Sequence, residues 1–179
     1  MNYAQLCKQS DTCNTQKPLV IYIEPYQLSY IQQIKINKDH IAFWVFDEIY
    51  IPITSVKQFK SEYFAEVAVC FVNKTEQNMT WQMPIQGGIA YHLKGTLRYK
   101  MSDWYKLMND FFYHKCKSNI QETIAIHLFN TIIKNCNKSS IAQLEYYFEN
   151  KLIPNLNASL KNVGIVITEL SLGDSIQKE

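Results

Sequence analysis

Glycine, proline and arginine are scarce in this sequence. The 179 residues include 5 Gly and 5 Pro, which excludes a collagen-like chain or a long linker. Charged residues make up only 19% and hydrophobic residues 47%, so the bulk of the chain is not intrinsically disordered. Arg98 is the only arginine among 18 basic residues, so bidentate recognition of phosphate or carboxylate could come from that side chain alone.

Long apolar runs are missing as well. Even the run from Ile41 to Phe46, which no other apolar run exceeds, is far short of the ~20 residues that a membrane-spanning helix needs. The first residues lack the basic start and apolar core of a signal peptide, so we expect a cytoplasmic protein. The cysteines are odd in number and irregularly spaced, which favours thiols over a disulfide framework. They are Cys7, Cys13, Cys70, Cys116 and Cys136.

Charge is balanced and evenly spread. The chain has 18 basic and 16 acidic residues, for a net charge of +2. Neither half carries the concentrated positive charge that is typical of nucleic-acid-binding proteins, so nucleic-acid binding would have to use a local stripe of basic residues. The sequence therefore disfavours nucleic acid as the partner.

The first half of the chain has the pattern of β-strands. Residues 1–17 are polar and aperiodic, so we expect a flexible arm there. Strands are predicted over 19–23 and over 41–53, the latter interrupted at Asp47-Glu48, with a turn at Lys38-Asp39 and an element of uncertain type over 26–36. The segment 65–72 is almost uncharged, which indicates a strand buried on both faces.

The clearest strand follows Gly87-Gly88 and covers residues 89–101. Its apolar residues recur at every second position, and Gly95 completes their row. Such alternation is typical of a sheet with one face in the core and one in water. The buried face is predicted to hold Tyr91, Leu93, Leu97 and Tyr99. The solvent face is predicted to hold His92, Lys94, Arg98 and Lys100.

Helical periodicity begins after residue 101. We expect a helix over 103–116 capped by Ser102, and a second over 118–135 with an inward stripe at i+4 spacing. A third is expected from 139 or 140 until Pro154 ends or kinks it. Gly164 suits a left-handed helix end, and a last strand is predicted over 164–172. The predicted fold class is α+β, with a mostly antiparallel sheet in the N-terminal half, three helices and a returning C-terminal strand.

Catalytic and metal sites find little support in the sequence. No Gly-x-Ser-x-Gly elbow or phosphate-cradling glycine loop is present, and a thiol in mid-strand, as at Cys70, is inert. A metal constellation would have to combine His114, Cys116, His127 and Cys136, of which only the first two are closely spaced. We therefore expect no catalytic residue, no metal and no other cofactor.

Three segments carry a family resemblance. The stretch from Tyr63 to Lys74 contains Phe71-Val72-Asn73 and leads to Trp81 and the pair Pro84-Ile85. A glycine-containing strand then runs into a helix, and the segment 164–170 follows the last helix. This order resembles the SPFH superfamily (stomatin, prohibitin, flotillin; band 7), and most closely its bacterial and phage virion core protein-like branch.

The resemblance implies a single SPFH-like α+β domain over residues 18–176. It further implies a non-enzymatic scaffold that self-associates or binds a protein partner, with membrane contact through a partner, and an origin in a phage or other mobile element. Gln82 stands where the branch usually has Gly, and Gly87-Gly88 replaces a more polar segment. An amino-terminal membrane anchor and a following coiled coil are not expected in this chain, which puts membrane association and ring assembly in doubt.

The alternative function is a small binding module for nucleic acid or an acidic protein. It would use the basic strand face formed by His92, Lys94, Arg98 and Lys100, although such a face is most often simply solvated. Tyr91 and Tyr99 are predicted on the opposite face, so stacking rings and positive charge would not be presented together. For self-association, the candidate surface is the second face of strand 66–72, if no helix covers it.

Overall fold

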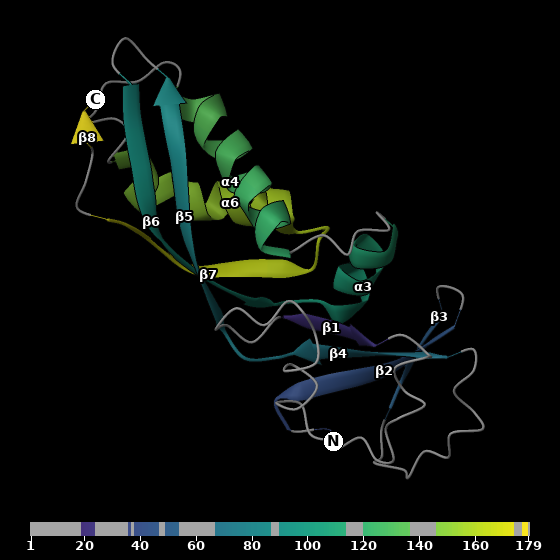
Figure 1. Cartoon of the computed structure of the whole chain (residues 1–179). Helices are drawn as coiled ribbons and strands as arrows, with labels where there is room; N and C mark the ends of the chain where they lie inside the picture. Colours follow the sequence, from purple (N-terminus) through teal and green to yellow (C-terminus); the bar gives the residue numbers. More distant parts are fainter. Residues whose placement is uncertain are drawn as a thin grey trace. The chain divides into compact units, whose positions relative to one another are not determined.

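The computed structural model describes residues 19–23, 36, 38–46, 49–53, 67–86, 90–113, 120–136, 146–173 and 177–178. The chain divides into two compact units, 1–75 and 76–179, whose elements are labelled in Figure 1. The predicted arm over 1–17 and nearly all of the element over 26–36 lie outside the described residues. The single domain over 18–176 stays a prediction.

The first unit contains one antiparallel sheet. Its strands are β1 (Val20–Ile23), β2 (His40–Phe46), β3 (Ile49–Pro52) and β4 (Ala68–Asn73), in the order β1-β4-β2-β3. β-Branched and aromatic side chains dominate all four, as expected of residues that pack on a pleated surface. The predicted turn at Lys38-Asp39 is confirmed, and the predicted interruption of the 41–53 segment separates β2 from β3.

Strand β4 is the centre of this unit. It pairs with β1 on one side and with β2 on the other, and all six of its residues are buried. The prediction of a strand buried on both faces is therefore confirmed. The same burial overturns the candidate self-association surface, because the second face of this strand is already covered within the chain.

The second unit contains the other sheet. Strands β5 (Gln77–Gln86), β6 (Ala90–Met101) and β7 (Ile165–Leu172) run antiparallel in the order β5-β6-β7, and β8 (Gln177–Lys178) pairs with the start of β6. Strand β7 returns to the sheet after the helices, as predicted for the last strand. Strand β5 was not predicted from the sequence, although the residues of this strand alternate between apolar and polar types.

Three helical segments follow β6 in the described chain: α3 (Trp104–Tyr113), α4 (Ile120–Cys136), and α6 (Ile153–Leu160) preceded by the π-helical turn η2 (Phe148–Leu152). Figure 1 shows α4 and α6 side by side on one face of the β5-β6-β7 sheet. The predicted inward stripe of α4 is confirmed, since Ile124, Leu128 and Ile132 are fully buried. The α+β class and its element order are thus confirmed.

The cap of α3 differs from the prediction by one residue. The Asp103 Oδ1 atom accepts hydrogen bonds from the backbone N–H groups of Tyr105 (3.0 Å) and Lys106 (3.2 Å). Asp103 is therefore the N-cap, and the helix begins at Trp104. Ser102 instead donates its backbone N–H to the carbonyl of Gly164 at 2.9 Å.

Pro154 does not end the third helix. It lies in the first turn of α6, and the residues on both sides of the η2–α6 junction have helical dihedral angles. Because proline has no N–H to donate one turn back, the helix needs a local rearrangement before it, and the π turn η2 lies there. Gly164 then adopts φ +75°, which confirms the predicted left-handed residue after the helix.

Candidate functional site

The predicted basic face belongs to strand β6 in the second unit. Lys94, Arg98 and Lys100 are exposed, whereas Leu93, Leu97 and Tyr99 are 7%, 1% and 2% exposed. The predicted alternation is therefore confirmed for these residues. The side chains of Tyr91 and His92 lie outside the described residues, so the role of His92 stays a prediction.

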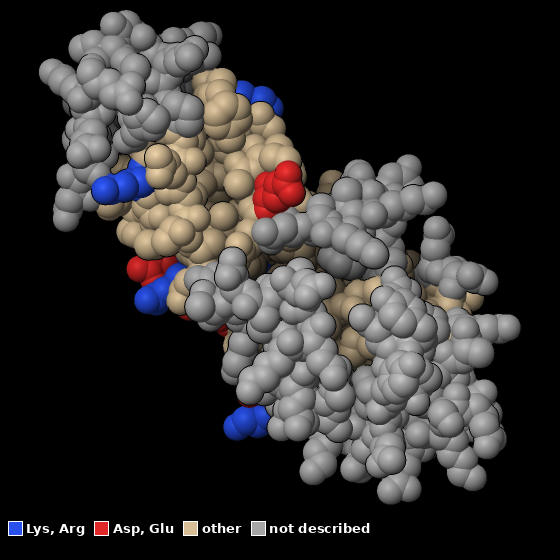
Figure 2. All heavy atoms as spheres, viewed as in Figure 1, with Lys and Arg blue, Asp and Glu red and all other residues tan. Residues whose placement is uncertain are grey.

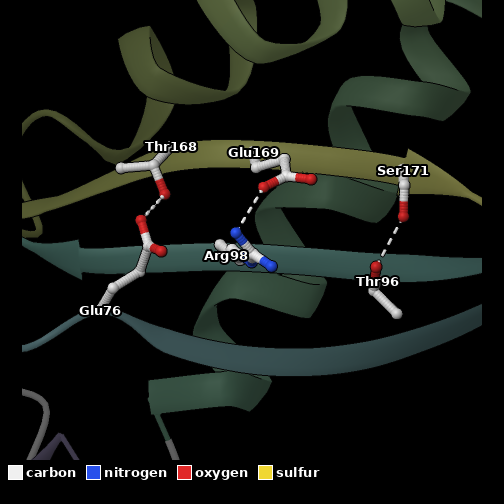
Figure 3. A network of polar contacts seen from close by, with 6 residues as sticks. All are labelled: Glu76, Thr96, Arg98, Thr168, Glu169 and Ser171. Atoms are coloured by element: carbon white, nitrogen blue, oxygen red, sulfur yellow. Dashed lines mark hydrogen bonds and ion pairs between the residues drawn. The ribbon is translucent and has the colours of Figure 1, made fainter.

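Arg98 is already paired within the chain. Its Nη1 atom lies 2.9 Å from Oε2 of Glu169, the residue directly opposite on β7, as Figure 3 shows. Both side chains remain about half exposed, so solvent weakens the pair to under about 1 kcal/mol. A phosphate or carboxylate that approached Arg98 would nevertheless have to compete with Glu169.

Hydroxyl groups flank this ion pair along the β6–β7 ladder. Thr96 Oγ1 and Ser171 Oγ lie 2.6 Å apart, and Thr168 donates to Glu76. In Figure 3 these side chains project from one face of the sheet, and the helices lie behind it. Cross-strand polar pairs of this kind hold neighbouring strands together, so structural stabilisation accounts for the polar network.

Two basic side chains of the face remain unneutralised. In the part of the chain that the structure describes, Lys94 and Lys100 make no ion pair. They lie six positions apart on one strand, which separates their Cα atoms by roughly 20 Å. On the view in Figure 2, the described acidic and basic residues are scattered and form no cluster of one sign. One phosphate group could not bind both lysines.

A different kind of surface appears at the end of the first sheet. Phe46, Ile49 and Ile51 are 40%, 62% and 47% exposed. Phe46 lies opposite Ile49, and Trp44 lies opposite Ile51, so all of these residues share one face of the β2–β3 hairpin. We call Phe46, Ile49 and Ile51 the β2–β3 patch.

The β2–β3 patch continues the buried face of the same sheet. Residues on this face of β1 and β4, such as Ile21 and Phe71, are at most 5% exposed. Along β2 the exposure rises from Ala42 at 1% to Phe46 at 40%. The apolar layer of the first unit therefore extends beyond its covered part and ends in the exposed patch.

Helix α4 carries exposed apolar side chains too. Ile126 is 54% exposed and Phe129 is 39% exposed, and both lie outside the buried stripe of the helix. Neither this surface nor the β2–β3 patch was predicted from the sequence. The available signals were apolar residues on both faces of the 41–53 segment and apolar residues outside the inward stripe of α4.

Burial keeps the side chains of Cys70 and Tyr99 neutral at physiological pH. Burial raises the pKa of the Cys70 thiol well above its ordinary value. Burial also raises the pKa of Tyr99, and a hydrogen bond with Gln121 offsets part of that increase. Neither residue is thus poised to act as an anionic nucleophile in the folded chain.

Of the four residues considered for metal binding, the structure describes the side chain of His127 alone. His127 Nδ1 lies 3.2 Å from the Ser159 hydroxyl, which links α4 to α6. His114 and Cys116, and the side chain of Cys136, lie outside the described residues.

Comparison of the sequence with protein-family models and with curated proteins gives no match. Among the described residues, no helix combines the length and the apolar character required to cross a membrane.

Proposed function

We propose that this chain is a non-enzymatic assembly domain of the SPFH-like type, which acts as a scaffold by associating with further copies of itself. The observation that carries the proposal is the β2–β3 patch. Its three large apolar side chains are 40–62% exposed and lie together on one sheet face.

The patch supports assembly because it is continuous with the buried apolar layer of the first unit. Single exposed apolar residues are common on protein surfaces, but a contiguous apolar group usually marks an interaction site. Here the exposed group is the open end of an apolar layer that is otherwise buried. Covering it would extend the core of the first unit and remove apolar surface from water at roughly 25 cal/mol per Å².

The resemblance to the SPFH superfamily supports the same proposal independently. That family provides scaffolds rather than enzymes, and contact with a membrane would then come through a partner. A cytoplasmic location and a phage or mobile-element origin remain part of the proposal.

The binding-module alternative has weaker support. Lys94, Arg98 and Lys100 do project from one face of β6, as that function would need. However, Arg98 is engaged by Glu169, and the two lysines are too far apart to grip one phosphate. An acidic protein with widely spaced carboxylates is the partner that this face would suit best.

Analytical ultracentrifugation under reducing conditions tests the assembly function. We expect the average mass of the wild-type chain to rise with concentration, and the variant Ile49→Thr/Ile51→Thr to shift the rise to higher concentration. Threonine keeps the β-branched shape that suits a strand but makes the surface polar. Leu172→Thr is the matched control, because Leu172 is an exposed strand residue (40%) outside the patch. A wild-type chain that stays monomeric at all concentrations would contradict self-association.

A further inference from the structure

Helix α4 has two apolar surfaces, and the fold of the second unit uses one of them. The inner surface, formed by Ile124, Leu128 and Ile132, is completely buried. The outer surface contains Ile126 and Phe129, and the half-buried Ile133 continues it. We call Ile126, Phe129 and Ile133 the outer stripe.

The spacing of the outer stripe is that of a helix-pairing surface. Its members are separated by three and then four residues, so they lie in one row along the helix. A surface helix of a globular protein normally has a single apolar stripe facing the core. The second row on α4 therefore fits contact with another helix.

The charges at the two ends of α4 indicate which helix would pair with its outer stripe. Glu122 lies in the first turn and Lys134 in the last, and both are exposed. Within the described chain neither makes an ion pair. They lie six residues on either side of Leu128, so an antiparallel copy of α4 centred there would bring each Glu122 level with the other copy's Lys134.

We propose that α4 pairs antiparallel, through its outer stripe, with α4 of a second copy of this chain. In this arrangement Ile126 of each copy lies beside Phe129 of the other. A pair formed by Glu122 of one copy and Lys134 of the other lies at each end of the contact. Parallel pairing would instead place Glu122 against Glu122 and Lys134 against Lys134. Antiparallel pairing also sets the opposite ends of the two helix dipoles beside each other.

The pairing is isologous, which means that it closes after two copies. It rests on the proposed function, because it names one of the self-association contacts. One helix pair buries less than the ~1,200–2,000 Å² of a typical stable interface, so we expect a weak dimer that depends on protein concentration.

The test uses the full chain carrying Ile49→Thr/Ile51→Thr, so that contacts through the β2–β3 patch are removed. Sedimentation equilibrium of this background should show a monomer–dimer equilibrium. Adding Glu122→Lys, or adding Lys134→Glu, should raise the dissociation constant roughly tenfold, because two attractive pairs become repulsive. Combining both exchanges should return it to within about threefold of the background, since opposite charges face each other again.

Glu149→Lys is the matched control, because it makes the same charge change at an exposed residue of η2. It should leave the dissociation constant unchanged. Rescue by the double exchange also excludes misfolding as the cause of the single effects.

The outcomes separate this inference from the proposed function. A background variant that is monomeric while the wild type assembles would overturn the α4 pairing and leave the assembly function in place. A variant with both exchanges that dimerises as weakly as the single variants would overturn the antiparallel arrangement. A wild-type chain that is monomeric throughout would overturn both.

Discussion

Gly95 lies directly opposite Trp81 in the β5–β6 ladder, and the indole ring of Trp81 covers it. A Cβ atom on Gly95 would come within 2.8 Å of Trp81 Cζ2 and within 2.0 Å of the Ser171 backbone oxygen. Trp81 itself is only 6% exposed. The absence of a side chain at Gly95 thus leaves the space that the buried Trp81 ring and the β7 backbone occupy.

Gly95→Ala should destabilise the protein by about 3 kcal/mol, because neither the ring nor the Ser171 carbonyl can move away cheaply. Urea denaturation measures the change. Gly173→Ala is the matched control, since the nearest atom to its added Cβ would be 3.5 Å away, an ordinary contact. Equal losses in the two variants would contradict the packing argument.

Asn157→Ala should cost about 1–3 kcal/mol of stability, because it leaves backbone groups of β7 unsatisfied. The Asn157 side chain donates to the carbonyl of Ile167 (3.0 Å) and accepts from its N–H (2.7 Å). Thermal or urea unfolding measures the loss. Asn155→Ala, which removes one exposed hydrogen bond to Tyr147, is the control and should cost less than half as much. A larger loss for Asn155→Ala would show that the β7 contact is not important.

Raising the pH above the ordinary thiol pKa of about 8.5 should destabilise the chain through Cys70. The folded state holds this thiol protonated, because burial raises its pKa, whereas the unfolded state releases the proton. The unfolded state therefore binds fewer protons, and stability falls as the pH rises. Between pH 7 and pH 9.5 the wild type should lose about 1.4 kcal/mol more than Cys70→Ala. Denaturation curves at both pH values measure the difference, and identical pH dependence would contradict the prediction.

Heparin chromatography distinguishes the assembly domain from the binding-module alternative. Glu169→Gln and Glu149→Gln remove the same charge, but only the first releases Arg98 from its ion pair. For an assembly domain we expect the two variants to elute at the same salt concentration. Later elution of Glu169→Gln alone would favour anion binding by the basic face, because phosphate-like contacts raise the salt needed for release.

Much of the fold follows from local patterns in the sequence. The thirteen alternating residues around β6 define which face is buried, because a shift of one residue would exchange the two faces. The inward stripe of α4 and the positive φ of Gly164 are equally local. Strand β5 was missed, although Met79, Trp81 and Met83 are buried between exposed polar residues. Only one Thr, one Trp and one Ile of this strand belong to the residue types that are enriched in strands.

The candidate surfaces were harder to predict than the fold. Whether an apolar strand face is covered depends on sheet order, and β4 proved to be a central strand while β3 lies at the edge. The partner of Arg98 depends on the pairing of β6 with β7, whose residues lie far apart in the sequence. Periodicity alone predicted the solvent face of β6 but could not show that Glu169 would lie opposite Arg98.

The π turn before α6 narrows the arc over which four buried side chains are spread around the helix axis. Phe148, Leu152, Leu156 and Leu160 are all buried, at intervals of exactly four residues. In a continuous α-helix each such interval turns the side chain about 40° further around the axis, so Leu160 would lie about 120° around the axis from Phe148. The wider turn over 148–152 offsets this drift by accommodating extra residues. Deleting one residue within 148–152 would rotate Phe148 relative to the three leucines. Chains descended from a common ancestor should therefore keep the π turn and the four-residue spacing together or lose both.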